Sequence, residues 1–215
     1  QSKFTTARQE GDRVEILSGV FEGKTTGTPI ALEVRNTDQR SHDYSNIMDV
    51  YRPGHADYTF DEKYGFRDYR GGGRSSGRET IGRVAAGAIA EELLKSLGIQ
   101  VQAYTKSIGD VTADMDKATP ENIMKSPLYM PDPEASEKAE LFLERNSAGG
   151  VIECIVKGMP AGIGEPVFDK LDANLAKAVM SIGAVKGVEI GDGFAVAGAF
   201  GSDNNDSFCK GQDGK

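Results

Sequence analysis

Apolar residues between positions 81 and 97 recur at steps of three and four, the spacing that places side chains on one face of an α-helix. The face comprises Ile81, Val84, Ala85, Ala88, Ile89, Leu93, Leu94 and Leu97. Ser76 and Glu79 match the S-x-x-E capping box that begins many helices, and Gly98 provides a stop. The pattern predicts a helix that begins just after Ser75, ends near Gly98 and buries one face in a core.

Strand patterns lie on both sides of this helix. Residues 13–34 contain two β-rich runs around a break at residues 21–24, which predicts a hairpin. Further strands are expected at residues 99–103, 150–156 and 185–190. The segment at 136–145 predicts a short helix. Because strands and helices do not alternate strictly, the order favours an α+β fold.

Three other segments have distinct patterns. Pro166 suits the first position of a helix that would run through Phe168 to Ile182 and close at Gly183. Residues 112–133 are polar and have no clear period. Residues 35–73 also lack apolar periodicity and are rich in Arg, Asp, Tyr and Gly. A loop of that length inside a compact domain is either functional or disordered.

Charge and hydropathy limit the function classes. The 215 residues carry a formal net charge of −8, which disfavours nucleic-acid binding through bulk positive charge. No apolar run approaches the ~20 residues of a membrane helix, and no export leader is visible. Cys154 and Cys209 are too few for a disulfide scaffold. We expect a single domain over residues 1–215, without a separate domain boundary, located in the cytoplasm.

The arginines are concentrated in one part of the chain. Eight of the eleven lie between positions 35 and 83, where Lys63 is the one lysine: Arg35, Arg40, Arg52, Arg67, Arg70, Arg74, Arg78 and Arg83. Arginine's planar fork binds phosphate and carboxylate oxygens through paired hydrogen bonds, whereas lysine is a solvated point charge. This choice of cation indicates recognition of anions.

The start of the predicted helix is the place where an anion would bind. Glycines at positions 71–73 allow close approach of the backbone, Ser75 and Ser76 add hydroxyls, and the helix directs free amides to the same point. Standard nucleotide-binding loops are not supported, because the Walker A pattern is absent. The alternative is a solvated salt-bridge network with Asp57, Asp61, Asp68 and Glu79.

Two histidines are candidates for proton transfer. His55 follows Pro53 and Gly54, which impose a turn, and it lies between Arg52 and Asp57. A histidine beside a bound anion is held protonated and can deliver a proton near neutral pH. The alternative is a surface histidine paired with Asp57. His42 has a weaker context, and neither histidine shows metal-ligand spacing.

At these positions the sequence resembles the chorismate synthase family. The resemblance rests on residues 18–23 (SGVFEG), 36–41 (NTDQRS), 52–57 (RPGHAD), 70–80 (RGGGRSSGRET), 158–168 (GMPAGIGEPVF) and 184–191 (AVKGVEIG), in the family's order. It implies the family's layered β-α-β sandwich, an α+β fold with an internal pseudo-repeat. Residues 1–215 would be the central portion of that single domain, truncated at both ends.

The resemblance also implies an activity. The family removes phosphate and a ring proton from 5-enolpyruvylshikimate-3-phosphate by an anti-1,4-elimination that yields chorismate, within aromatic amino acid biosynthesis. It is a lyase that requires reduced FMN and forms a homotetramer, without metal, membrane or nucleic acid. The family is also associated with NADP, and the source of the reduced flavin, a separate reductase or the enzyme itself, stays open.

Site residues follow from the same resemblance. His55 matches the catalytic histidine that protonates the reduced flavin, and Arg52 and Arg78 match arginines that hold the substrate. Lys3 stands where the family has a basic residue in an anion-binding region. The positions that match FMN contacts are Arg74, Ser75, Ser76, Gly183 and Ala184.

The chain also departs from the family pattern. The family's N-terminal Gly-Glu-Ser-His-Gly segment and its C-terminal Arg-His-Asp-Pro segment have no counterpart here. Gly77 and Gly183 stand where relatives often have Ala and Asn. We expect this piece alone to be inactive and to bind FMN weakly. The alternative function is a flavin- or phosphate-binding module without catalysis.

Overall fold

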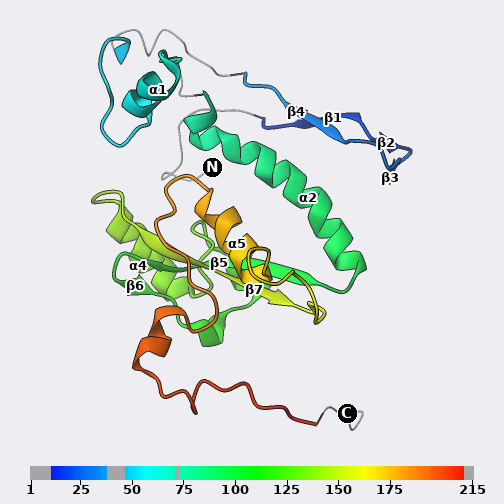
Figure 1. Cartoon of the computed structure of the whole chain (residues 1–215). Helices are drawn as coiled ribbons and strands as arrows, with labels where there is room; N and C mark the ends of the chain where they lie inside the picture. The colour runs from blue at the N-terminus through cyan, green and yellow to red at the C-terminus, as the bar shows by residue number, and fades with distance from the viewer. Residues whose placement is uncertain (1–10, 38–46, 71–72, 211–215) are drawn as a thin grey trace. The chain divides into compact units, whose positions relative to one another are not determined.

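The computed structural model describes residues 11–37, 47–70 and 73–210. The chain forms two compact units, Gln1–Met159 and Pro160–Lys215. Both helices and sheets are present, which confirms the α+β class (Figure 1). The expectation of one undivided domain stays a prediction.

The first unit begins with the predicted hairpin. Strand β1 (Val14–Ser18) pairs antiparallel with β4 (Ala31–Val34), and β2 (Val20–Phe21) pairs with β3 (Lys24–Thr25). Glu22 and Gly23 both have positive φ, as a tight two-residue hairpin turn requires. The break expected at residues 21–24 is therefore the tip of the hairpin.

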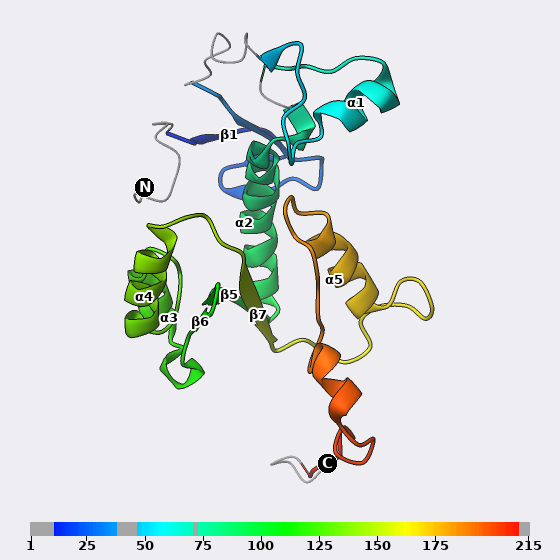
Figure 2. The same ribbon diagram turned by 90° about the vertical axis from the view of Figure 1, so that its left-hand side faces the viewer.

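The segment after the hairpin contains helix α1 (Asp57–Tyr64), which its sequence pattern did not predict. Two short 3₁₀ helices follow, η2 (Gly73–Ser75) and η3 (Gly77–Glu79), and lead into the long helix α2 (Thr80–Ser96). Gly98 has φ +78 and ends α2 as expected. In Figures 1 and 2, α1 lies near the end of α2 where that helix begins.

A three-stranded antiparallel sheet in the order β6-β5-β7 completes the first unit. Its strands are β5 (Gln100–Ile108), β6 (Val111–Thr112) and β7 (Gly150–Lys157). A 3₁₀ turn, η4 (Met115–Lys117), and helices α3 (Pro120–Lys125) and α4 (Pro133–Leu143) lie between β6 and β7 in sequence. Figure 2 shows α3 and α4 beside β6.

The packed core lies between this sheet edge and α4. Met130 and Ala139 are fully buried, and they contact Ala113 and Ala135. Asp132 caps α4 by accepting from the Glu134 amide, and Pro133 occupies the first helical position, so α4 begins before the predicted residue 136. The polar segment 112–133, which had no clear period, contributes to this core.

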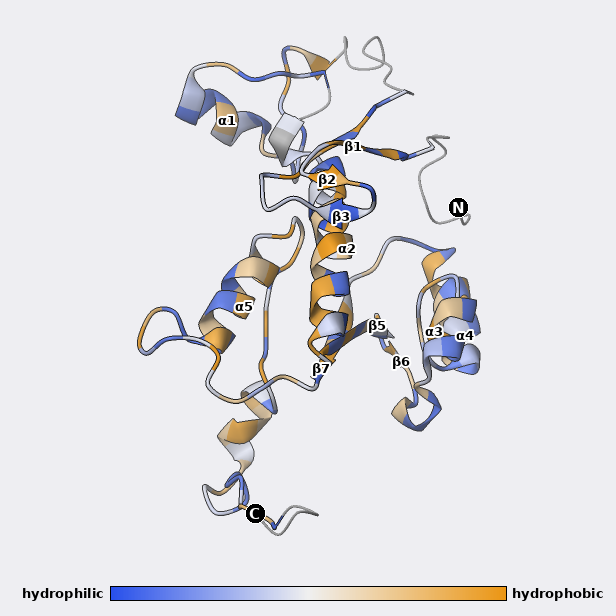
Figure 3. Ribbon diagram, turned by 90° about the vertical axis from the view of Figure 1, so that its right-hand side faces the viewer, coloured by the Kyte–Doolittle hydropathy of each residue, from blue (hydrophilic) through white to orange (hydrophobic). Residues whose placement is uncertain are grey.

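Helix α2 differs from its prediction in burial. Val84, Leu93 and Leu97 belong to the predicted core face, yet they are 71%, 62% and 63% exposed. Figure 3 shows orange, hydrophobic segments along α2. The expected burial of that face is wrong for the described part of this chain. No helix in that part is both long and apolar enough to cross a membrane.

The second unit contains α5 (Leu171–Met180) and the 3₁₀ helix η5 (Gly193–Gly198). The prediction that Pro166 opens α5 is wrong. Val167 has φ +71, which no α-helix accepts, and a bridge from Gly164 to Lys170 folds the chain back first. The strand expected at residues 185–190 is also wrong, because that segment has no ladder partner among the residues described.

Candidate functional site

A tight turn carries His55. The His55 amide donates to the Arg52 carbonyl at 3.2 Å, with Pro53 and Gly54 at the two central positions. Gly54 has φ +74, so the segment is a type II turn, in which the third residue needs a left-handed conformation. His55 Nδ1 lies 3.1 Å from the Pro53 carbonyl. A carbonyl only accepts, so Nδ1 carries the proton in the neutral ring and Nε2 is the atom that exchanges one.

Asp57 anchors this turn at the first residue of α1. Its carboxylate accepts from the Arg52 amide at 3.0 Å, from Arg52 Nε at 2.8 Å and from Arg52 Nη2 at 2.9 Å. These bonds from Arg52 hold the pKa of Asp57 well below its ordinary range, against the opposing effect of burial. The pairing of His55 with Asp57 that we kept as an alternative is therefore wrong, since Asp57 binds arginines.

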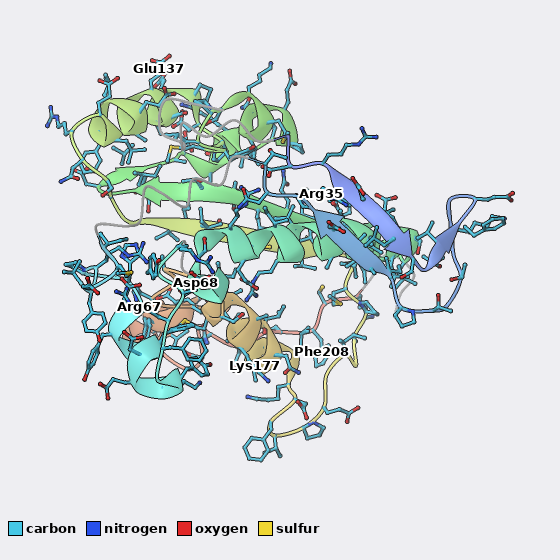
Figure 4. All side chains as sticks on the ribbon, turned by 90° about the horizontal axis from the view of Figure 1, so that it is seen from above. Arg35, Arg67, Asp68, Glu137, Lys177 and Phe208 are labelled. Carbon is cyan, nitrogen blue, oxygen red and sulfur yellow. The ribbon has the colours of Figure 1, made fainter. Side chains whose placement is uncertain are left out.

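Arg67 is the second arginine on this carboxylate. Its Nη1 lies 3.1 Å from Asp57 Oδ2, and its Nε lies 3.4 Å from Asp61. Nη2 donates to three carbonyls of the preceding loop, those of Ile47, Met48 and Val50, at 3.1, 2.8 and 2.8 Å. The Arg67 side chain is only 7% exposed (Figure 4).

The salt-bridge alternative is thus correct in part. All four acids that it named pair with arginines, including Asp68 with Arg70 and Glu79 with Arg83. The outer pairs are solvated, but the pair of Asp57 and Arg67 is buried. A buried pair has a different energetic meaning, because both charges have lost water.

The second cluster lies where α2 begins. Ser76 precedes η3, and its hydroxyl accepts from the Arg78 amide at 3.3 Å. Ser76 therefore caps the 3₁₀ turn rather than α2 itself. The predicted capping box is not formed, since the Ser76 amide donates to Gly73 and the Glu79 side chain pairs with Arg83. Arg78 Nη2 donates to Asp12 at 2.9 Å.

A groove of about 620 Å³ opens beside this cluster. One wall is apolar and comes from β4 and α2, and the polar end comes from the two 3₁₀ turns. The lining residues are Ile30, Leu32, Val34, Gly73, Arg78, Glu79, Ile81, Gly82 and Ala85. Such a groove suits a ligand that has both a flat apolar part and a negative charge.

The predicted site residues fall into three groups. Arg52 and His55 share one turn, and Ser75, Ser76 and Arg78 lie in or between the two 3₁₀ helices. Gly183 and Ala184 belong to the second unit, in a turn that follows α5.

Two predicted contacts fall outside what the structure describes, namely Lys3 and the side chain of Arg74. Ala184 has φ +69, a conformation that costs an alanine about 1–3 kcal/mol and often marks functional turns. The sequence patterns did not reveal Asp12 or the structural part of Arg67. Their contacts join segments far apart in the chain, so no local pattern signals them.

The fold is α+β, and its groove combines an apolar wall with the guanidinium of Arg78, a group that can bind an anion. A family model for chorismate synthase matches residues 1–214. The chain is 67% identical over 220 residues to chorismate synthase of Lachnoclostridium phytofermentans, covering 100% of this chain and 60% of the relative. It is 64% identical over 213 residues to that of Agathobacter rectalis, covering 97% and 58%.

A solved structure gives the same result. A crystal structure of chorismate synthase matches with a TM-score of 0.74 and 36% identity, over 90% of this chain and 59% of that one. The chain belongs to the chorismate synthase family. It spans about 60% of the length of the curated relatives that it matches.

Proposed function

We propose that the chain supplies the central part of a chorismate synthase, a carbon–oxygen lyase of aromatic amino acid biosynthesis. Its substrate would be 5-enolpyruvylshikimate-3-phosphate, from which phosphate and a ring proton leave to give chorismate. The whole enzyme would be an FMN-dependent, cytoplasmic homotetramer. The groove beside Arg78 is the observation that carries the proposal, together with family membership.

The residues of the groove fit the implied cofactor. A flavin combines an apolar ring with a phosphate, and the groove places the apolar side chains of Ile30, Leu32 and Ile81 beside Gly73, which directly precedes residues 74–76. We assign Arg74, Ser75, Ser76, Gly183 and Ala184 to FMN binding. Reduced FMN, when bound, supplies electron density that eases departure of the phosphate.

Arginines would hold the substrate, which carries a phosphate and two carboxylates. The Arg52 side chain is 22% exposed and fixed by Asp57, and that of Arg78 is 31% exposed and lies 2.9 Å from Asp12. A guanidinium held in place loses less conformational entropy when it binds an oxyanion. We assign Arg52 and Arg78 to substrate binding, with Lys3 as a further cation.

His55 would protonate the reduced flavin, as does the family's histidine that it matches. Since Nδ1 is committed to the Pro53 carbonyl, Nε2 is the atom that takes up and delivers the proton. Histidine changes its charge near neutral pH, which suits this work. His55 is exposed, so a proton also reaches it from solvent.

A chimera tests the proposal. These 215 residues replace the matching residues of the Lachnoclostridium phytofermentans relative, whose flanking segments restore the family's length. With reduced FMN and 5-enolpyruvylshikimate-3-phosphate under anaerobic conditions, the chimera should release phosphate and form chorismate. The 215-residue chain alone should release none. A chimera that binds FMN without turnover would favour the non-catalytic flavin-binding module.

A further inference from the structure

Neither Asp57 nor Arg67 was given a part in the reaction proposed above. Their ion pair is nevertheless the most buried one among the described residues. Both side chains are 7% exposed. Removing two charges from water costs several kcal/mol for each ion, and replacing such a pair with apolar residues is often neutral or stabilising. Stability alone therefore does not explain why charges occupy these two positions.

Arg67 reaches elements that the chain's local structure does not join. Helix α1 ends at Tyr64, and Gly65 follows it with a positive φ. The chain turns there, so that Arg67 contacts Asp57 and Asp61 of the same helix. From there its guanidinium donates to the carbonyls of residues 47, 48 and 50, forms ion pairs with Asp57 and Asp61, and lies over the face of Tyr51 at 5.1 Å. One side chain thus holds the loop before the His55 turn against the helix after it.

Asp57 links Arg67 to the turn that carries His55. Its Oδ2 faces both Arg67 Nη1 and Arg52 Nε, and Oδ1 accepts from Arg52 Nη2. The Arg52 carbonyl accepts the hydrogen bond that closes the turn around Pro53 and Gly54, and the Arg52 amide donates to Asp57. A movement of Asp57 therefore moves the Arg52 fork and the His55 ring together.

We propose that Asp57 and Arg67 are positioning residues, which fix the Arg52 guanidinium and the His55 imidazole in the geometry that the reaction uses. The inference rests on the function proposed above. A lysine at position 67 would keep the charge but lacks the planar fork that binds three carbonyls and two carboxylates together. Displacement of a reacting group by about 1 Å costs on the order of 100-fold in rate.

Kinetics of the chimera form the first arm of the test. Arg67→Lys should lower kcat at least about tenfold through His55 and raise KM through Arg52. The matched control is Arg35→Lys, since Arg35 pairs with Glu33 at 3.5 Å and is 68% exposed (Figure 4). It should change neither constant more than about twofold, the effect of one exposed pair. Assays well below the unfolding temperature separate positioning from loss of folded protein.

A milder variant covers the case in which Arg67→Lys does not fold. Asp61→Asn removes the partly exposed carboxylate on Arg67 Nε and leaves the Asp57 contacts in place. It should also lower kcat, by about two- to fivefold. Unchanged kcat in a folded Arg67→Lys chimera, or in Asp61→Asn where Arg67→Lys is unfolded, overturns the inference.

The second arm uses the 215-residue chain and needs neither cofactor nor turnover. The chain has two histidines, so His55 is alone in a His42→Gln background. Imidazole carbon and nitrogen shifts should show the Nδ1-protonated form, as the Pro53 contact requires, and Arg67→Lys should shift the ring toward the free-imidazole mixture. An unchanged tautomer overturns the inference. If the unmodified chimera lacks turnover, the proposed function fails and this arm still decides the positioning claim.

Discussion

Arg78 donates through Nη2 to Asp12, a residue that lies 66 positions earlier in the chain, at 2.9 Å. The bond joins the segment before the N-terminal hairpin to the turn that opens α2. Arg78 also lines the groove that has an apolar wall and a polar end. Asp12 therefore competes for the same guanidinium that an anionic ligand would bind. Asp12 is 55% exposed on its side chain, so the competition takes place in contact with water.

Loss of this competing charge should strengthen anion binding. Asp12→Asn keeps a residue that tolerates the positive φ at this position and removes the carboxylate. We expect 5-enolpyruvylshikimate-3-phosphate to bind the 215-residue chain up to about fivefold more tightly, since exposed ion pairs contribute up to about 1 kcal/mol. Isothermal titration calorimetry measures the change, and Glu33→Gln, which alters the Arg35 pair, is the control. Weaker binding by Asp12→Asn would mean that Asp12 orients Arg78 rather than competing for it.

Two glycines should respond in opposite directions to the same substitution. Gly54→Ala forces alanine into φ +74, which costs about 1 kcal/mol even though nothing lies near the new methyl group. Gly87→Ala, inside α2, also meets no atom within 4 Å and should stabilise the chain by about 1 kcal/mol through helix propensity. Urea unfolding of both variants gives the comparison. Equal signs would contradict the type II turn at residues 52–55.

Tyr104 should titrate well above the ordinary tyrosine range. It is 3% exposed, and its hydroxyl donates to Glu153 on the paired strand. Burial and this bond raise the pKa of Tyr104 to about 12. The bonded, neutral form therefore contributes stability that is complete below the ordinary tyrosine pKa and is lost as pH rises toward about 12.

Absorbance at alkaline pH measures this titration. Tyr104→Phe should remove the absorbance change of one tyrosine near pH 12. Tyr129→Phe, which alters an exposed tyrosine, provides the control and should leave that change in place. An unchanged absorbance step near pH 12 in Tyr104→Phe would show that Glu153 does not hold the hydroxyl.

The elements that the sequence predicted correctly are those whose pattern is local. Helix α2, the hairpin turn at Glu22 and Gly23, and strand β7 each carry their own periodicity or turn residues. Helix α1 was missed because its stability comes from Asp57, whose partners Arg52 and Arg67 lie outside the helix. Ion pairs between segments of this kind produce no periodic pattern of apolar residues, so the sequence does not reveal them.

The candidate site is visible in the sequence only in part. The arginine concentration and the turn at Pro53 and Gly54 can be seen there, whereas the roles of Arg52, His55 and Arg78 follow from the resemblance to the family and stay predictions. The sequence does not show which arginines bind a ligand and which are structural. An arginine that binds a ligand and an arginine that binds backbone carbonyls are the same residue type. Only the burial of Arg67 and its three carbonyl contacts separate the two roles.

His55 separates the enzyme from a passive flavin-binding module. In the chimera, His55→Ala should lower turnover about 100-fold or more, the usual contribution of a positioned general acid. FMN affinity should stay within about twofold, because the ring's polar contact is to Pro53 rather than to the groove. Single-turnover assays and flavin titration measure the two effects separately. Retained turnover in His55→Ala would remove this residue from the proposed chemistry.

The Asp57 carboxylate should make the stability of the first unit depend on pH in a defined direction. Its pKa is lowered by folding, so it binds a proton less readily in the folded chain than in the unfolded one. The stabilisation is then complete above the ordinary Asp pKa of about 3.9 and is lost as pH falls toward the lower value of the folded state. Asp57→Asn never has this charge and leaves two guanidiniums without their shared partner.

The measurement is therefore the difference in the free energy of unfolding between the original chain and Asp57→Asn, followed by urea titration across pH. The difference should be constant from neutral pH down to about 5 and should shrink below that, because only the original chain gains a proton there. Asp68→Asn is the matched control, since its pair with Arg70 is more than half exposed and is screened by water. Its difference should be small at every pH. A difference for Asp57→Asn that grows on acidification would contradict the hydrogen bonds between Arg52 and this carboxylate, and with them the anchoring of the His55 turn.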